Sequence, residues 1–292
     1  MCCRTHTHGR RSARKGFTLI ELLTVIAVIA VLASLLLPVL ASTKAKGRAI
    51  MCLSNERQLM LASLVYVGDF NDALPYNLGS GEIKKLEAQQ QFLNWSTPVM
   101  SWELDSDNTN RIWLTQGGIG PYASSTALVY RCPSDSVVSD IQAQAGWTAR
   151  VRSISMNAMV GNAGQFLQSG ANVNNPEFYQ FLTLGQIPEP ARIFVLTEEH
   201  PDSINDGYFL NKPESLQWLD LPASYHNGSA NLAFADGHVE SHKWRFASTK
   251  PPSHPDAAHL PFQVPPTERG DYYWLMERTT IESYSATAAG GP

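Results

Sequence analysis

The sequence predicts an α+β protein in which a long N-terminal helix crosses a membrane and packs on an antiparallel β-sheet head. Residues 17–40 form an apolar run, residues 51–67 repeat apolar side chains at helical spacing, and residues 229–244 alternate around an Asp-Gly turn. The 292 residues are 43% hydrophobic and 16% charged, with a formal net charge of −4. This composition allows a sizeable core and gives no basic excess for binding nucleic acid.

The apolar run from Phe17 to Leu40 is long enough to span a bilayer as a helix. A helix of 24 residues rises about 36 Å, against roughly 30 Å of hydrocarbon core. A removable secretory signal is the alternative, but its apolar part is shorter, about 7 to 15 residues. Basic residues are more numerous before the run than after it, which predicts a cytoplasmic N-terminus and an extracytoplasmic head. They are Arg4, Arg10, Arg11, Arg14 and Lys15 on one side and Lys44, Lys46 and Arg48 on the other.

A dense motif, Lys15-Gly16-Phe17-Thr18-Leu19-Ile20-Glu21, leads into this apolar run, and Pro38 lies near the end of the run. The stretch resembles the prepilin cleavage and methylation motif of type IV pilins and of type II secretion pseudopilins, the major pseudopilin included. The resemblance implies a pilin-like fold. It also implies that a prepilin peptidase cuts between Gly16 and Phe17, releasing a leader of residues 1–16, and that the new amine of Phe17 is methylated.

Glu21 is the only ionisable side chain between Phe17 and Leu40. A charge at the centre of a membrane helix costs roughly 2.5–3.5 kcal/mol, and less near an end. Glu21 lies only about 6 Å along the helix from Phe17. Intramembrane carboxylates are usually paired, and cleavage would supply the α-amine of Phe17 in a neighbouring subunit as a partner. The alternatives are that Glu21 reaches the headgroups or is protonated.

The remainder of the chain is predicted as three segments. Residues 41–70 continue the helix onto the head, with apolar side chains at helical spacing on one face. Residues 71–248 form the α+β head, in which 151–160 and 192–197 are strands, the second one central because it is apolar on both faces. Residues 249–292, rich in Pro and then in Ala and Gly, are expected to be irregular. The predicted helix face consists of Leu53, Met60, Leu64 and Val67.

The four cysteines fall into two pairs. Cys2 and Cys3 would leave with the leader, whereas Cys52 and Cys132 would remain in the mature chain. Two cysteines in an extracytoplasmic domain favour one disulfide, and two separate buried thiols are the alternative. Zinc is not expected from the sequence, since there are only two such cysteines and no C-x-x-C spacing.

An acidic segment that contains Glu199, Asp202 and Asp206 follows the predicted central strand. Oxygen-rich loops suit calcium, although the spacing does not fit an EF-hand. The resemblance adds weight to calcium, because major pseudopilins carry this ion in the head. The alternative is a solvated, hydrogen-bonded turn. Calcium is therefore an open candidate cofactor, and no other cofactor is predicted.

His226 precedes Asp236-Gly237 by a spacing that resembles the H-X9-DG C-terminal signature of pilin-like proteins. The strand between them spans about 20 Å, so His226 and Asp236 cannot share one ion. We expect Asp236 and Gly237 to form a hairpin turn and His226 to hold the neighbouring Asn227-Gly228 turn.

A two-residue turn at Asp236-Gly237 would place Phe234 opposite Val239 and Ala233 opposite Glu240. Leu232, Phe234 and Val239 would then share the core face. On the second strand His238, Glu240 and His242 share a face. This face is either a polar sheet surface or a set of transition-metal ligands.

The sequence therefore predicts a structural subunit of a type IV pilus-like filament or a type II secretion pseudopilus. The chain would be a single-pass protein of the inner membrane with a periplasmic head, able to be extruded into a filament. Its partners would be the prepilin peptidase and other pilin or pseudopilin subunits. No Ser-His-Asp set, P-loop or dinucleotide fingerprint is apparent, so an enzyme is not expected.

The alternative is a membrane-anchored binding protein or hydrolase that uses a pilin-type anchor. Its aromatic residues Trp95, Trp102 and Trp113 would bind carbohydrate. A deep pocket lined by Glu198, Glu199 and Asp202 would favour this alternative.

Overall fold

The computed structural model describes residues 18–255 and 259–283 and divides into two compact units, residues 1–44 and 45–292. In the first unit the described residues form the beginning of α1 (Leu19–Asp69), which includes Pro38. Its large apolar side chains are exposed, from Leu19 at 80% to Leu40 at 66%. The helix is long and apolar enough to cross a membrane. This agrees with the predicted span, because lipid-facing side chains need no protein partner.

The second part of α1 is the central helix of the head. Its buried side chains recur every three or four residues, as in Cys52, Glu56 and Leu59, which are all fully buried. Of the predicted helix face, Met60 and Val67 are buried and Leu53 and Leu64 are half-buried. The buried stripe is therefore rotated slightly from the prediction, towards positions occupied by Cys52 and Glu56.

A five-stranded sheet in the order β5-β1-β4-β7-β8 lies against this helix. The neighbours are antiparallel, except that β1 and β5 are parallel. β4 is central and fully buried, as predicted, because both of its faces are covered. The strands are β1 (Ile154–Asn157), β4 (Phe194–Glu198), β5 (Tyr208–Phe209), β7 (Ser229–Phe234) and β8 (Val239–Lys243).

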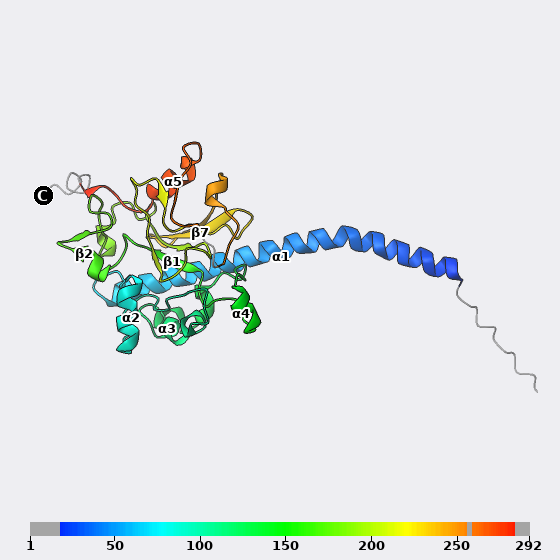
Figure 1. Cartoon of the computed structure of the whole chain (residues 1–292), viewed down its shortest axis with the longest axis horizontal. Helices are drawn as coiled ribbons and strands as arrows, with labels where there is room; N and C mark the ends of the chain where they lie inside the picture. Colours follow the sequence, from blue (N-terminus) through cyan, green and yellow to red (C-terminus); the bar gives the residue numbers. More distant parts are fainter. Residues whose placement is uncertain (1–17, 256–258, 284–292) are drawn as a thin grey trace, which may run out of the picture. The chain divides into compact units, whose positions relative to one another are not determined.

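Each face of the sheet has its own hydrophobic cluster. On one face Met156, Val195 and Ala233 pack with Leu59 of α1 and with Trp95 from the segment beyond it. Figure 1 shows α2, α3 and α4 on the side of α1 away from β1 and β7. The remaining elements on this side and at the sheet edge are α2 (Ser80–Ala88), α3 (Ile112–Thr115), α4 (Asp140–Gln144), β2 (Leu167–Gln168) and β3 (Ala171–Asn172).

The described residues after Ser248, 249–255 and 259–283, include a helix that covers the other face of the sheet, so the expectation that this segment is irregular was wrong for that helix. α5 (Arg269–Met276) contributes Tyr272 and Leu275 to the buried cluster that contains Leu232 and Phe234 of β7. Figure 1 shows α5 on the side of α1 opposite α2, α3 and α4. β9 (Phe262–Gln263) pairs with β6 (Gln217–Trp218). The Pro-rich composition concealed this short helix, whose aromatic side chains complete the second core cluster.

The β7–β8 hairpin forms where it was predicted, but its register differs by one residue. Ala233 is opposite Val239, and Leu232 is opposite Glu240. The loop has three residues, Ala235-Asp236-Gly237, and Gly237 adopts φ +93°, as in hairpins that end in a glycine bulge. Val239 consequently packs with Ala233 on the side of α1 and not with Leu232 and Phe234.

We predict that Leu59→Ala destabilises the head by about 2–5 kcal/mol, because Leu59 is fully buried between α1 and the sheet. Leu61→Ala is the matched control on the same helix, where Leu61 is 49% exposed. It should cost less than about 1 kcal/mol. Urea unfolding of the detergent-solubilised chain measures both changes. Equal destabilisation by the two substitutions would contradict the packing described here.

Candidate functional site

The N-terminal site lies at the start of α1. Gly16 and Phe17 fall outside the described residues, of which Thr18 is the first. The Glu21 carboxylate accepts hydrogen bonds from the Thr18 backbone N–H and hydroxyl, both at 2.8 Å. The Glu21 N–H donates to the Thr18 hydroxyl at 3.2 Å. This is a reciprocal capping box, whose Thr-x-x-Glu signature is visible in the sequence.

A second site lies inside the head, where four segments bring sulfur, nitrogen and oxygen atoms together. Cys52 comes from α1, Cys132 from the turn after a short helix (Ala127–Tyr130), Glu198 from the end of β4, and His226 from the turn before β7. One potential ligand atom from each residue lies within 4.8 Å of the other three. Among the described residues, this is the one such convergence of His, Cys, Asp and Glu side chains.

Short contacts link the four side chains of this cluster. The Cys52 thiol donates to Glu198 Oε1 at 2.6 Å. The same oxygen lies 3.0 Å from His226 Nε2, which lies 3.4 Å from Cys132 Sγ. Glu198 Oε2 accepts the Asn231 N–H at 2.7 Å, and this bond fixes the carboxylate with Oε1 towards the cluster.

The surroundings of the cluster shift the pKa values of its two thiols in opposite directions. Burial, followed by the neighbouring Cys132 and Glu198, raises the pKa of Cys52 far above its usual range. The neighbouring Cys52 thiol and the adjacent His226 lower the pKa of Cys132, although burial opposes this. Burial alone would lower the pKa of His226, but its contacts with Cys132 and Glu198 raise it to about 10.

These contacts correct two predictions. Cys52 and Cys132 are free thiols and not a disulfide, because each sulfur faces a different polar partner, Glu198 or His226. The side chain of His226 does not hold the Asn227-Gly228 turn. The backbone closes that turn with a bond from the His226 N–H to the Ser229 carbonyl at 3.2 Å. The spacing of His226 to Asp236-Gly237 had singled out the histidine, but no sequence signal linked it to Cys132.

The three candidate calcium ligands do not converge among the described residues, and two of them, Asp202 and Asp206, have other partners. Asp202 accepts the Ser253 hydroxyl at 2.6 Å and the His254 N–H at 2.8 Å. Asp206 accepts the Ser80 N–H at 2.7 Å. Glu199 is 2% exposed, and burial raises its pKa to about 7. Asp202 and Asp206 therefore hold neighbouring segments together through hydrogen bonds, as the alternative to calcium required. The turn is not solvated as that alternative expected, since Asp206 and Glu199 are buried.

His238, Glu240 and His242 also remain separate. His238 contacts Asp236 and stacks on Phe234. The ring of His242 stacks on Trp274 of α5 with centroids 3.5 Å apart. Burial lowers the pKa of His242 to about 4, and Arg278 and Arg245 act in the same direction against the opposing charge of Asp271. Of this strand face, His242 thus contacts α5, whereas Glu240 is exposed.

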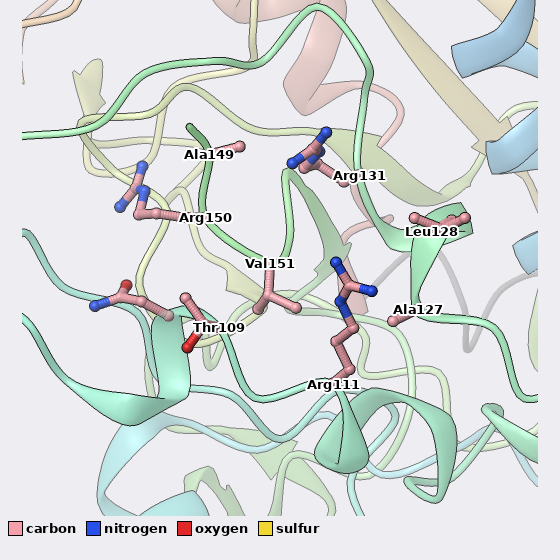
Figure 2. A pocket seen from close by; sticks show the side chains of 9 residues that line it. Thr109, Arg111, Ala127, Leu128, Arg131, Ala149, Arg150 and Val151 are labelled. Atoms are coloured by element: carbon pink, nitrogen blue, oxygen red, sulfur yellow. The ribbon is translucent and has the colours of Figure 1, made fainter. Parts of the chain in front are cut away.

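A small basic pocket lies at the surface, lined by Arg111, Arg131, Arg150 and neighbouring residues (Figure 2). Its volume of about 80 Å³ is well below the roughly 300 Å³ at which small-molecule sites begin. Arg150 is already engaged, since it donates to the Pro201 carbonyl at 2.7 Å and lies 3.8 Å from the Trp102 ring centre. The pocket is therefore a weak candidate for a ligand site.

Comparison with known families gives one match. The family described as the prokaryotic N-terminal methylation motif matches residues 11–37, which include Gly16, Phe17 and Glu21. No curated protein and no solved structure matches the chain. The motif, with the apolar helix that follows it, supports a membrane-anchored, processed precursor of the type IV pilin or pseudopilin type. It implies processing by a prepilin peptidase and assembly with other pilin subunits.

We predict that acid destabilises the head partly through His242. Its pKa is lowered in the folded state, so the unfolded chain binds the extra proton and stability is lost as the pH falls from about 6.5 towards 4. In His242→Gln the dependence of unfolding free energy on pH should be flatter by up to about 1.4 kcal/mol per pH unit. Urea unfolding between pH 7 and 4.5 tests this. His259→Gln, at an exposed position, is the control, and equal pH dependence in the two variants would refute the prediction.

Proposed function

We propose that the mature chain is a structural subunit of a type IV pilus-like filament or a type II secretion pseudopilus. It would be held in the inner membrane, with the head on the periplasmic side, until assembly. The observation that carries the proposal is the methylation motif at residues 11–37, which runs into a 51-residue helix that begins at Leu19. The first part of that helix exposes its apolar side chains, and the second part is the core helix of the head.

The exposed apolar part of α1 supports assembly through this helix. Side chains such as Leu22, Ile29 and Leu36, at 56%, 58% and 66% exposure, need lipid before assembly. In a filament the same side chains would pack against the helices of neighbouring subunits. A helix that only anchors an enzyme would not need a cleavage and methylation site at its N-terminus.

Glu21 has two roles in this proposal. In the single chain its carboxylate caps the first turn through Thr18. After cleavage, the amine of Phe17 in an adjacent, axially shifted subunit would provide a positive partner at the same depth. Because the carboxylate is near the end of the helix, exchanging one partner for the other does not require a bare charge at the membrane centre.

The burial of two of the carboxylates considered for a substrate pocket supports a structural rather than an enzymatic head. Glu198 and Glu199 are 0% and 2% exposed, so neither lines an open substrate pocket. Trp95 and Trp113, at 0% and 7% exposure, belong to the interior. Trp102 is covered on one side by Arg150. The aromatic residues proposed for carbohydrate binding are thus mainly structural.

Co-expression with a prepilin peptidase should convert the precursor to a chain that begins with methylated Phe17. Intact-protein mass spectrometry and N-terminal peptide sequencing measure the product. Without the peptidase the leader should remain, and Gly16→Val should block conversion, because a branched side chain replaces the small residue at the cut. A mature N-terminus elsewhere, for example near Ser42, would contradict the proposal.

Glu21→Gln should reduce incorporation into filaments at least tenfold while leaving precursor cleavage intact, because the amide keeps the shape but has no negative charge to form an ion pair with the amine. Glu240→Gln, on an exposed position of β8, is the matched control. Shearing of cells followed by quantitative immunoblotting compares assembled and membrane fractions. Normal incorporation of the Glu21→Gln variant would show that charge pairing is dispensable.

A further inference from the structure

We propose that Cys52, Cys132, Glu198 and His226 bind one zinc ion inside the head. The four residues come from α1, the turn after Tyr130, β4 and the turn before β7, which are distant in sequence. Their potential ligand atoms nevertheless lie within 4.8 Å of one another. Two sulfurs, one imidazole nitrogen and one carboxylate oxygen are a ligand set that zinc accepts in tetrahedral sites.

Two of the distances between the potential ligand atoms agree with those of a tetrahedral zinc site. Zinc binds sulfur at about 2.3 Å and nitrogen or oxygen at about 2.0–2.2 Å, so tetrahedral ligand atoms lie about 3.3–3.8 Å apart. His226 Nε2 and Cys132 Sγ are 3.4 Å apart, and His226 Nε2 and Glu198 Oε1 are 3.0 Å apart. Cys52 Sγ and Glu198 Oε1 are closer, at 2.6 Å. Zinc would require this pair to separate by about 1 Å, which side-chain rotation can provide.

The surroundings orient these ligands as they would around a metal. Glu198 Oε2 is held by the Asn231 N–H, and Cys132 Sγ accepts the Ser134 N–H at 3.4 Å. The Cys132 N–H in turn donates to the Ser153 hydroxyl at 2.6 Å. Such outer contacts fix the ligand atoms and are a regular part of zinc sites.

Burial explains why these polar groups need a strong partner. Cys52, Cys132 and Glu198 are fully buried, and the His226 side chain is 4% exposed. Glu56, one helical turn from Cys52, is fully buried as well, and neither of its carboxylate oxygens has a hydrogen-bond partner among the described residues. A divalent ion would offset the cost of burying so many acidic groups together.

The proposed ion would act as a cross-link between the anchor helix and the sheet. A disulfide between Cys52 and Cys132 could join the same two segments, α1 and the turn after Tyr130. It would not engage Glu198, which contacts the Cys52 sulfur, or His226, which contacts the Cys132 sulfur. The mixed ligand set therefore favours zinc over the disulfide, and it suits a structural site, because all four positions are supplied by protein.

Metal analysis of the full chain tests the proposal. The chain is produced with Cys2→Ser and Cys3→Ser, so that leader thiols do not contribute, and is purified in detergent without chelators. Elemental mass spectrometry should give about one zinc per chain. Cobalt substitution should give the visible and near-ultraviolet bands of tetrahedral thiolate coordination. Removal of zinc by a strong chelator should lower the melting temperature by on the order of 10 °C.

Variants separate binding at this cluster from binding elsewhere. Cys52→Ser, Glu198→Gln and His226→Gln should each lower zinc affinity at least tenfold. Glu199→Gln is the matched control, since Glu199 is the adjacent, equally buried carboxyl outside the cluster, and it should retain zinc. Circular dichroism checks that each variant is folded. If a variant is unfolded, the cobalt spectrum of the chain with all four cluster residues still tests metal binding at this site.

Three outcomes would overturn the proposal. The first is a metal-free chain whose mass is lower than that of the reduced chain by two hydrogen atoms, which shows a Cys52–Cys132 disulfide. The second is a chain with free thiols that takes up no zinc on dialysis against zinc salts. The third is zinc that remains bound equally well in all three ligand variants.

Discussion

The fold depends on one constraint, which is that a single helix must be stable in two different environments, a lipid bilayer and the interior of the head. The first part of α1 leaves its apolar side chains uncovered, as a helix in lipid requires. The second part carries a buried stripe, from Cys52 through Leu59 to Val67, around which the head is built. In both environments the backbone N–H and C=O groups must be paired, and hydrogen bonds within the helix provide the partners. The difference between the two parts lies entirely in the side chains.

The buried stripe also explains why the head has two unlike cores. The cluster facing α1 contains small and aliphatic side chains such as Ala233 and Val195, which allow a helix to approach the sheet closely. The opposite cluster is rich in aromatic side chains, among them Trp218, Trp244 and Tyr272. Short segments with little regular structure fill that side, and large rings give each of them enough buried area to be held.

Patterns confined to one segment were sufficient to predict the membrane span, the continuous helix, the central position of β4 and the existence of the β7–β8 hairpin. Features set by contacts between distant segments were not accessible from sequence. The register of β8 depended on whether Ala235 belonged to the strand or to the loop. The role of α5 depended on the sheet face that Tyr272 covers. The partners of Cys132 depended on the topology that brings His226 and Glu198 to it, with 94 residues separating the cysteine from the histidine.

The internal site illustrates how such contacts arise. Cys52 was expected to pair with Cys132, and these two side chains do approach each other. The end of β4 and the turn before β7 meet at the same point, because both strands are neighbours in the sheet and run antiparallel. The side chains of Glu198 and His226 are directed from these two places towards Cys52 of α1 and Cys132. Because Glu198 and His226 occupy those positions, the two cysteines lie in a cluster with a carboxylate and an imidazole.

The position of residues 52–67 within the core has a practical consequence for making a soluble form of this protein. Removing the whole of α1 would delete one wall of the interior and leave Met156, Val195 and Ala233 uncovered. A soluble version must therefore retain the helix from about Ala45 onward, where the second compact unit begins. Exchanging heads between related subunits would likewise require the junction to be placed in the membrane-facing part of the helix, upstream of this position.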